Sequence, residues 1–158
     1  DYLSNHSVTL TNKRQLVIAS CGGFPRDINM IQAHKVLEFA QYAVNPGGTI
    51  ILLAECREGA GHPGFYNWFR NMDLPEIEGK LRSNYEVYGQ TAYSLLSKTK
   101  KFRVICVSEL PERRVREMGM EPAKDLEAAL SMLDTHTKSE PGYILPFGAT
   151  ILPLVEGQ

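Results

Sequence analysis

The feature that most constrains the fold is a pair of short, uninterrupted apolar runs, each bordered by residues that break regular structure. The run at 16–19 ends in the turn sequence S-C-G-G, and the run at 50–54, within an expected strand at 49–55, follows the breaker N-P-G-G. This pattern is typical of strands that are buried on both faces of a parallel sheet. Between the runs, apolar residues recur with helical spacing at positions 33, 36, 37, 40 and 44. A helix is therefore expected over 29–44.

The remaining segments continue the alternation of strands and helices. Strands are expected at 102–107 and 143–147, with an apolar tail at 151–155. Helices are expected at 65–72, 75–84, 91–100, 112–118 and 122–133. This alternation predicts an α/β fold with a mainly parallel sheet and helices on both faces, a three-layer, Rossmann-like arrangement. Ligands of such sheets bind beyond the carboxyl ends of the strands, where the segments 20–35 and 55–64 lie.

Length and charge narrow the class of protein. The 158 residues suffice for one domain. The 17 Lys and Arg residues nearly cancel the 18 Asp and Glu residues, which leaves a net charge of -1. This balance argues against a nucleic-acid partner and against a polybasic membrane anchor. The apolar runs are of strand length, whereas a membrane-spanning helix needs about 20 residues, so no membrane partner is expected.

The cysteines and histidines are too scattered for a complete metal site. Cys21, Cys56 and Cys106 are 35 and 50 residues apart, and the four histidines include no pair at i, i+4. Metal-ligand pairs are normally closer in sequence. An odd number of cysteines suits a reducing cytoplasm better than a secreted disulfide framework. We expect all three to be small buried residues near strand ends.

The start of the chain suggests that it comes from a longer protein. It begins at Asp1 with the sequence D-Y-L-S, without an initiator Met or a basic-then-apolar signal region. We therefore expect residues 1–158 to be a single α/β domain excised from a longer protein, or a processed chain. In that case the chain holds part of an active site.

The segment 20–35 reads S-C-G-G-F-P-R-D-I-N-M-I-Q-A-H-K and has unusual chemistry. Its glycines permit a sharp turn, and the helix that follows is expected to offer free N–H groups to a carboxylate or phosphate. Gln32 and Lys35 share a helix face away from the apolar stripe. An amide and an ammonium group there suit an anionic, hydroxylated small molecule. In the alternative interpretation, Gln32 closes a capping-box-like turn with Asn29 and Lys35 is solvated surface.

The segment 59–64 reads G-A-G-H-P-G and matches the G-x-G-x-x-G pattern letter by letter. The dinucleotide fingerprint requires these glycines directly after a strand and at the start of a helix. Here residues 56–58 intervene, and Pro63 precedes the third glycine. A glycine loop that borders a cleft is therefore favoured. Glu55, at a strand end, is either a site carboxylate or a local cap or ion-pair partner.

Taken together, the pattern S-x-G-G-x-P-x-D-x-x-x-x-Q-x-x-K at 20–35 resembles the carboxyl-terminal domain of the nickel-dependent lactate racemase family. Three further segments agree in the same order: G-G-T-I-I at 47–51, A-E-C-x-E-G-x-G at 54–61, and I-L-P through L-P at 144–153. The resemblance extends from about residue 15 to the end of the chain.

This resemblance implies a two-domain isomerase that racemises or epimerises 2-hydroxyacids in the cleft between its domains. The family is understood to pass a hydride to and from a nickel-pincer nucleotide. The lysine that tethers this cofactor, the nickel-binding histidine and the acid–base histidines belong to an amino-terminal domain that has no counterpart here. The chain is therefore expected to be inactive alone, with no catalytic or metal-binding residue and no tightly bound cofactor. Its expected partners are a 2-hydroxyacid and the missing domain.

The resemblance also implies roles for particular residues. Gln32 and Lys35, the Q-x-x-K pair, are expected to help hold the substrate. Ile31 stands where the family often has an aromatic residue, which implies a different wall of the substrate pocket. The loops beside the pair are expected to line the cleft through Gly22, Gly23, Asp27, Ile31, Glu55, Gly59 and Gly61.

Two other hypotheses stay open at this point. One is a nicotinamide-dinucleotide-binding oxidoreductase domain built on the 59–64 loop, which saturable NADH binding by the chain would favour. The other is a non-catalytic interaction module that retains a degenerate site.

Overall fold

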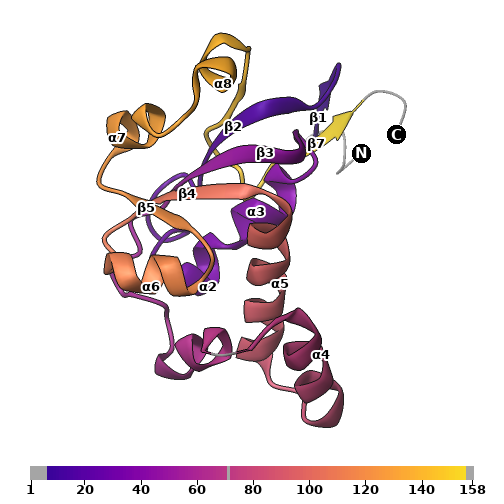
Figure 1. The fold of residues 1–158 in the computed structure, drawn as a ribbon, viewed down its shortest axis with the longest axis vertical. Helices are drawn as coiled ribbons and strands as arrows, with labels where there is room; N and C mark the ends of the chain where they lie inside the picture. Colours follow the sequence, from indigo (N-terminus) through magenta and orange to yellow (C-terminus); the bar gives the residue numbers. More distant parts are fainter. Residues whose placement is uncertain (1–6, 71, 156–158) are drawn as a thin grey trace.

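The chain folds around a five-stranded parallel sheet (Figure 1). The structure, a computed structural model, describes residues 7–70 and 72–155. The strand order is β5-β4-β3-β2-β6, and every neighbouring pair is parallel. The strands are β2 (Arg14–Ser20), β3 (Val44–Leu53), β4 (Arg103–Val107), β5 (Glu121–Ala123) and β6 (Tyr143–Leu145). The predicted α/β class with a parallel sheet is confirmed.

A second, two-stranded sheet lies to one side of the main sheet (Figure 1). In it, β1 (Ser7–Leu10) pairs in parallel with β7 (Leu152–Val155). β7 is the apolar tail expected at 151–155. β1 is not predicted from the sequence, because Leu10 alone of its four residues is buried and no apolar run marks it.

Helices cover both faces of the main sheet, as expected. Those that pack on the face of Val17, Ile50 and Val104 are α2 (Met30–Ala33), α3 (Lys35–Ala40), α5 (Val87–Lys101), α6 (Glu112–Glu117) and the 3₁₀ helix η1 (Pro63–Phe69), with α4 (Leu74–Ser83) beside α5. On the opposite face, α7 (Leu126–Ser131) packs against Ile51 and Ile105, and α8 (Thr135–Ser139) follows it. None of the described helices has both the length and the apolar character that crossing a membrane requires.

The helix predicted over 29–44 is shorter in the structure and is divided into α2 and α3. Its apolar stripe is buried as expected, but the helix ends at Ala40 and β3 begins at Val44. The N-P-G-G breaker therefore lies inside β3, where two steps along β2 correspond to five along β3. This irregularity accommodates the extra residues, and the positive φ of 75° at Gly47 shows why glycine suits the bend.

The helix predicted over 122–133 is also partly wrong, because β5 takes its first residues. Pro122 lies in this edge strand, where its missing N–H group costs no ladder hydrogen bond. Both oxygens of the Glu121 carboxylate accept hydrogen bonds from Arg103 of β4, at 2.8 Å each. The helix α7 starts later, after Asp125 caps it by accepting from the Ala128 N–H group at 2.7 Å.

The three cysteines are buried free thiols near the strand ends, as expected. Burial raises the pKa of Cys21 to about 12 and that of Cys106 to about 11, and it also raises the pKa of Cys56. We predict that a thiol reagent leaves all three unmodified in the folded chain at neutral pH and titrates all three after unfolding in denaturant. Modification of any thiol at a rate faster than unfolding would contradict this prediction.

Candidate functional site

The two segments expected beyond the carboxyl ends of the strands lie side by side. Backbone hydrogen bonds join the loop after β2 to the loop after β3. The Cys56 N–H group donates to the Asp27 carbonyl at 2.8 Å, and the Glu58 N–H group donates to the Ile28 carbonyl at 2.9 Å. These bonds fix the position of both loops relative to α2.

The start of α2 is occupied by the same loop, so the expected anion site at free N–H groups is wrong. The N–H groups of Met30 and Ile31 donate to the carbonyls of Gly59 and Ala60 at 3.0 and 3.1 Å. The Gln32 N–H group donates to the Asn29 side chain at 3.0 Å. Asn29 is therefore the N-cap of α2, as the alternative interpretation holds. The Gln32 backbone takes part in this cap, and the Gln32 side chain makes a different contact.

The Gln32 side chain pairs with Lys35 across the junction of α2 and α3. Lys35 Nζ donates a hydrogen bond of 2.7 Å to Gln32 Oε1. Because that bond uses the amide oxygen, the amide N–H₂ group of Gln32 and two ammonium hydrogens of Lys35 are left as donors. Lys35 is exposed, and it makes no ion pair with any residue that the structure describes. The pair is therefore a compact, positively charged set of donors.

The neighbours of this pair do not cancel its charge. Burial lowers the pKa of His34, so its ring is neutral near pH 7. The nearby Glu38 carboxylate accepts hydrogen bonds from Ser94 Oγ and, at 2.6 Å, from Lys98 Nζ. These contacts tie α3 to α5 and neutralise Glu38, so Lys35 carries the uncompensated charge.

We predict that Glu38 contributes a small, pH-dependent part of the stability. Burial acts to raise the pKa of Glu38, but the hydrogen bonds from Lys98 and Ser94 outweigh it and lower that pKa below 4.5. The stabilisation is thus present above the unfolded pKa and is lost as the pH falls through the lower, folded pKa. We expect it to be below about 1 kcal/mol, because the Glu38 side chain is 37% exposed.

Urea unfolding measured between neutral and acidic pH checks this prediction. The Glu38→Gln variant should lose less stability on acidification than the unsubstituted chain. The exposed Glu140→Gln variant is the control and should follow the unsubstituted chain. Equal pH dependence in all three proteins would show that the Glu38 contacts do not stabilise the fold.

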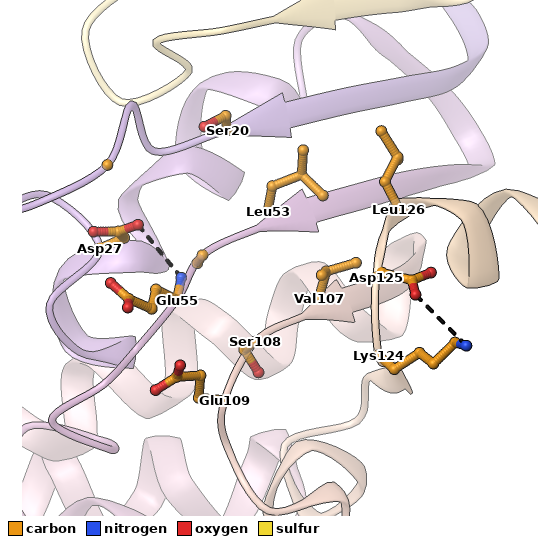
Figure 2. A pocket seen from close by; sticks show the side chains of 12 residues that line it. Ser20, Asp27, Leu53, Glu55, Val107, Ser108, Glu109, Lys124, Asp125 and Leu126 are labelled. Atoms are coloured by element: carbon orange, nitrogen blue, oxygen red, sulfur yellow. Dashed lines mark hydrogen bonds and ion pairs between the residues drawn. The ribbon is translucent and has the colours of Figure 1, made fainter.

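A separate cavity of about 500 Å³ lies at the carboxyl ends of β2, β3, β4 and β5 (Figure 2). Its charged lining residues are four acids and one lysine: Asp27, Glu55, Glu109, Asp125 and Lys124. A carboxylate ligand is therefore repelled by most of the charges in this cavity, whereas the Lys35–Gln32 pair attracts it.

The residues predicted to line one cleft are distributed over several places. Gly23, Asp27 and Glu55 line the large cavity, while Gly59 and Gly61 line a second depression of about 290 Å³ with His62 and Tyr66. The others line neither of these two depressions: Gly22, packed against Phe147; Ile31, half-buried against the core; and the pair Gln32 and Lys35.

Sequence reasoning missed several residues of the large cavity. Ser108 and Glu109 follow β4 directly, so the strand-end rule that selects Glu55 also selects them. Lys124 and Asp125 follow β5 directly. The strand-end rule did not select them, because the sequence predicted a helix over 122–133 in place of this strand.

The glycine loop at 59–64 lacks the surroundings of a dinucleotide fingerprint. It starts six residues after Leu53, the last residue of β3, and it leads into the 3₁₀ helix η1. Its carbonyl groups cap α2 instead of leaving that helix end open. The loop therefore supports the start of α2, and it does not have the strand–turn–helix geometry that binds a pyrophosphate.

Comparisons with known proteins agree with the resemblance. The chain matches the model of the lactate racemase C-terminal domain over residues 10–152. The lactate racemase of Thermoanaerobacterium thermosaccharolyticum is 29% identical over 159 residues, which cover 96% of this chain and 37% of that protein. The lactate racemase of Lactiplantibacillus plantarum is 39% identical over 61 residues, which cover 39% of this chain and 14% of that protein.

Solved structures give the same result. The lactate racemase apoprotein from Thermoanaerobacterium thermosaccharolyticum matches with a TM-score of 0.84 and 28% identity, over 97% of this chain and 38% of that one. A Thermotoga maritima protein matches with a TM-score of 0.60 and 14% identity, over 94% of this chain and 39% of that one, which shows the fold alone. The chain spans 37% of the length of the first curated relative. Because the family model covers most of its residues, the chain belongs to the lactate racemase C-terminal domain family.

Proposed function

We propose that this chain is the substrate-holding, carboxyl-terminal domain of a two-domain, nickel-pincer-dependent 2-hydroxyacid racemase or epimerase, and that it is inactive alone. Family membership and the lactate racemase relatives support a small hydroxyacid as the substrate. The greater length of the Thermoanaerobacterium relative, of which this chain covers 37%, supports the presence of a second domain.

The hydrogen bond between Lys35 Nζ and Gln32 Oε1 is the observation that carries the proposal. It holds an ammonium group and an amide N–H₂ group together on one exposed surface. A 2-hydroxyacid brings a carboxylate, which the Lys35 charge attracts, and Gln32 donates a second hydrogen bond. Two contacts of this kind fix the orientation of C2, which is an effect worth many-fold in rate.

Binding and orientation are the whole role that we assign to this chain. Within residues 7–70 and 72–155, no three His, Cys, Asp or Glu side chains are arranged to hold a metal ion. We place the nickel-pincer nucleotide on the second domain, because the family resemblance assigns the tethering lysine and the nickel-binding histidine to that domain. Division of labour between a cofactor that does the chemistry and a protein surface that positions the substrate is common in cofactor enzymes.

The test is an assay of the full-length protein, produced together with the enzymes that make the nickel-pincer nucleotide. D- and L-2-hydroxyacids are incubated with it and separated by chiral chromatography. Conversion of one enantiomer into the other, lost when nickel is withheld, would support the proposal and identify the substrate. Absence of conversion by protein that carries the cofactor would reject simple 2-hydroxyacids as substrates.

A further inference from the structure

The small sheet of β1 and β7 is unusual for a parallel sheet, because it has only two strands among the residues that the structure describes. Purely parallel sheets occur almost only where both faces are covered. A two-stranded sheet needs packing against other elements to be stable, and this one lies to one side of the main sheet (Figure 1). What packs on its two faces therefore decides whether it is stable.

One face of the small sheet packs against the main core. Side chains alternate between the two faces along a strand, and residues paired in register share a face. Leu10 and Val155 are such a pair. Leu10 is buried in the main core, and Val155 packs against that core. Pro153 lies on the same face and is buried too.

The opposite face, which we call the outer face, carries Thr9, Leu152 and Leu154. Leu154 is 44% exposed, Thr9 is exposed and Leu152 is half-buried. A strand with one face in water normally alternates apolar with polar residues, but residues 151–155 read I-L-P-L-V. This sequence is typical of a strand that is covered on both faces. The part of the chain that the structure describes supplies a cover for the inner face alone.

The chain ends bring the rest of the full-length protein close to the outer face. The family model matches residues 10–152, so three of the four residues of each strand lie outside it. Six residues precede β1 and three follow β7. An extended residue spans at most about 3.6 Å, so a second domain attached at either end starts within about 25 Å of the small sheet.

The position of β7 also relates this face to the Gln32–Lys35 pair. β7 packs beside α3, the helix that begins with Lys35. Because α3 has six residues, it is only about 9 Å long. A domain that covers β7 therefore lies close to the helix that carries Lys35, as a substrate site between two domains requires.

We propose that the second domain of the full-length protein packs on the outer face of the small sheet and covers Leu154. This inference rests on the proposed function, which supplies the second domain. None of the eight residues of β1 and β7 is charged. The surface that meets them is therefore apolar, because a charge buried there without a partner is unfavourable.

Photocrosslinking of the full-length protein tests the contact without relying on its activity. The photoreactive residue p-benzoylphenylalanine replaces Leu154 in one variant and Tyr85 in the control. Tyr85 is 65% exposed and follows α4, which lies at the opposite end of the molecule from the small sheet (Figure 1). After irradiation, mass spectrometry identifies the cross-linked peptides. We expect the probe at 154 to cross-link to peptides from outside the 158-residue chain, and the probe at 85 to give no such cross-links.

Two results of this experiment would overturn the proposal. One is a probe at 154 that forms no cross-links or reacts only within residues 1–158, and the other is an equal yield of interdomain cross-links from both positions. The outcome is separate from that of the racemisation assay. A protein that racemises its substrate without the cross-link at 154 would reject the contact and keep the proposed function, and the reverse result would do the opposite.

Matched lysine variants of the full-length protein provide a second measurement. Leu154→Lys places a charge on the outer face, and burial of that charge under the second domain is unfavourable. The midpoint of thermal unfolding should therefore fall by about 2 °C or more. Tyr85→Lys adds the same charge at an exposed position far from the small sheet and should leave the midpoint unchanged. Equal midpoints in the two variants would show that the outer face is open to water.

Discussion

Replacing Lys35 with alanine is expected to weaken substrate binding by the full-length protein by about 10-fold or more, with little change in stability. The variant removes the proposed charge-assisted hydrogen bond to the substrate carboxylate, and hydrogen bonds to charged groups contribute more to binding than neutral ones. Stability should hardly change because Lys35 is exposed and its hydrogen bond is to Gln32, only three residues away in the same helical segment. The measurement is the apparent substrate affinity from racemisation kinetics, together with the thermal unfolding midpoint.

A second lysine provides the control for this prediction. Lys100 is exposed near the end of α5, and Lys100→Ala removes the same charge from the protein. If only the net charge mattered, both variants would lose affinity equally. Unchanged kinetics in Lys35→Ala would show that Lys35 is solvated surface, as the alternative interpretation of the sequence holds.

The fold class is predictable from this sequence because a strand that is buried on both faces has consecutive apolar residues. Ile50, Ile51 and Leu52 are consecutive in β3, and all three are fully buried. Consecutive apolar residues of this kind distinguish a covered parallel strand from a half-exposed one, in which apolar and polar residues alternate. The parallel direction of the strands and the helices on both faces then follow from the alternation along the chain, whereas the strand order β5-β4-β3-β2-β6 comes from the structure.

Features that depend on contacts between distant residues were not predictable. An ion pair between Glu121 and Arg103, which are 18 residues apart, links the strand β5 to β4. The residues of β5 form no local pattern that predicts a strand. The N–H groups at the start of α2 form hydrogen bonds with carbonyl groups of a loop almost thirty residues later in the chain. The spacing of Gln32 and Lys35 is local and did predict their shared face, whereas the large cavity needs residues from four strand ends.

The largest effect on stability expected in the loop region follows from Gly61→Ala. Gly61 has a φ of 96°, and a Cβ atom there would lie 2.7 to 2.8 Å from the side-chain atoms of Asn29. Asn29 can move away only by giving up its hydrogen bond to the Gln32 N–H group, which caps α2. The strained backbone and the lost cap should together cost roughly 2–3 kcal/mol in the free energy of unfolding.

Gly59→Ala separates these two causes. Gly59 also has a positive φ, of 69°, but a Cβ atom there meets nothing within 4 Å. It should therefore cost about 1 kcal/mol from backbone strain alone. Urea unfolding of both variants measures the difference, which is the contribution of the Asn29 cap. Because the same cap holds Gln32 in place, Gly61→Ala should also weaken substrate binding in the full-length protein, and Gly59→Ala should not. Equal losses of stability and equal affinities would show that the loop at 59–64 does not position the Gln32–Lys35 pair.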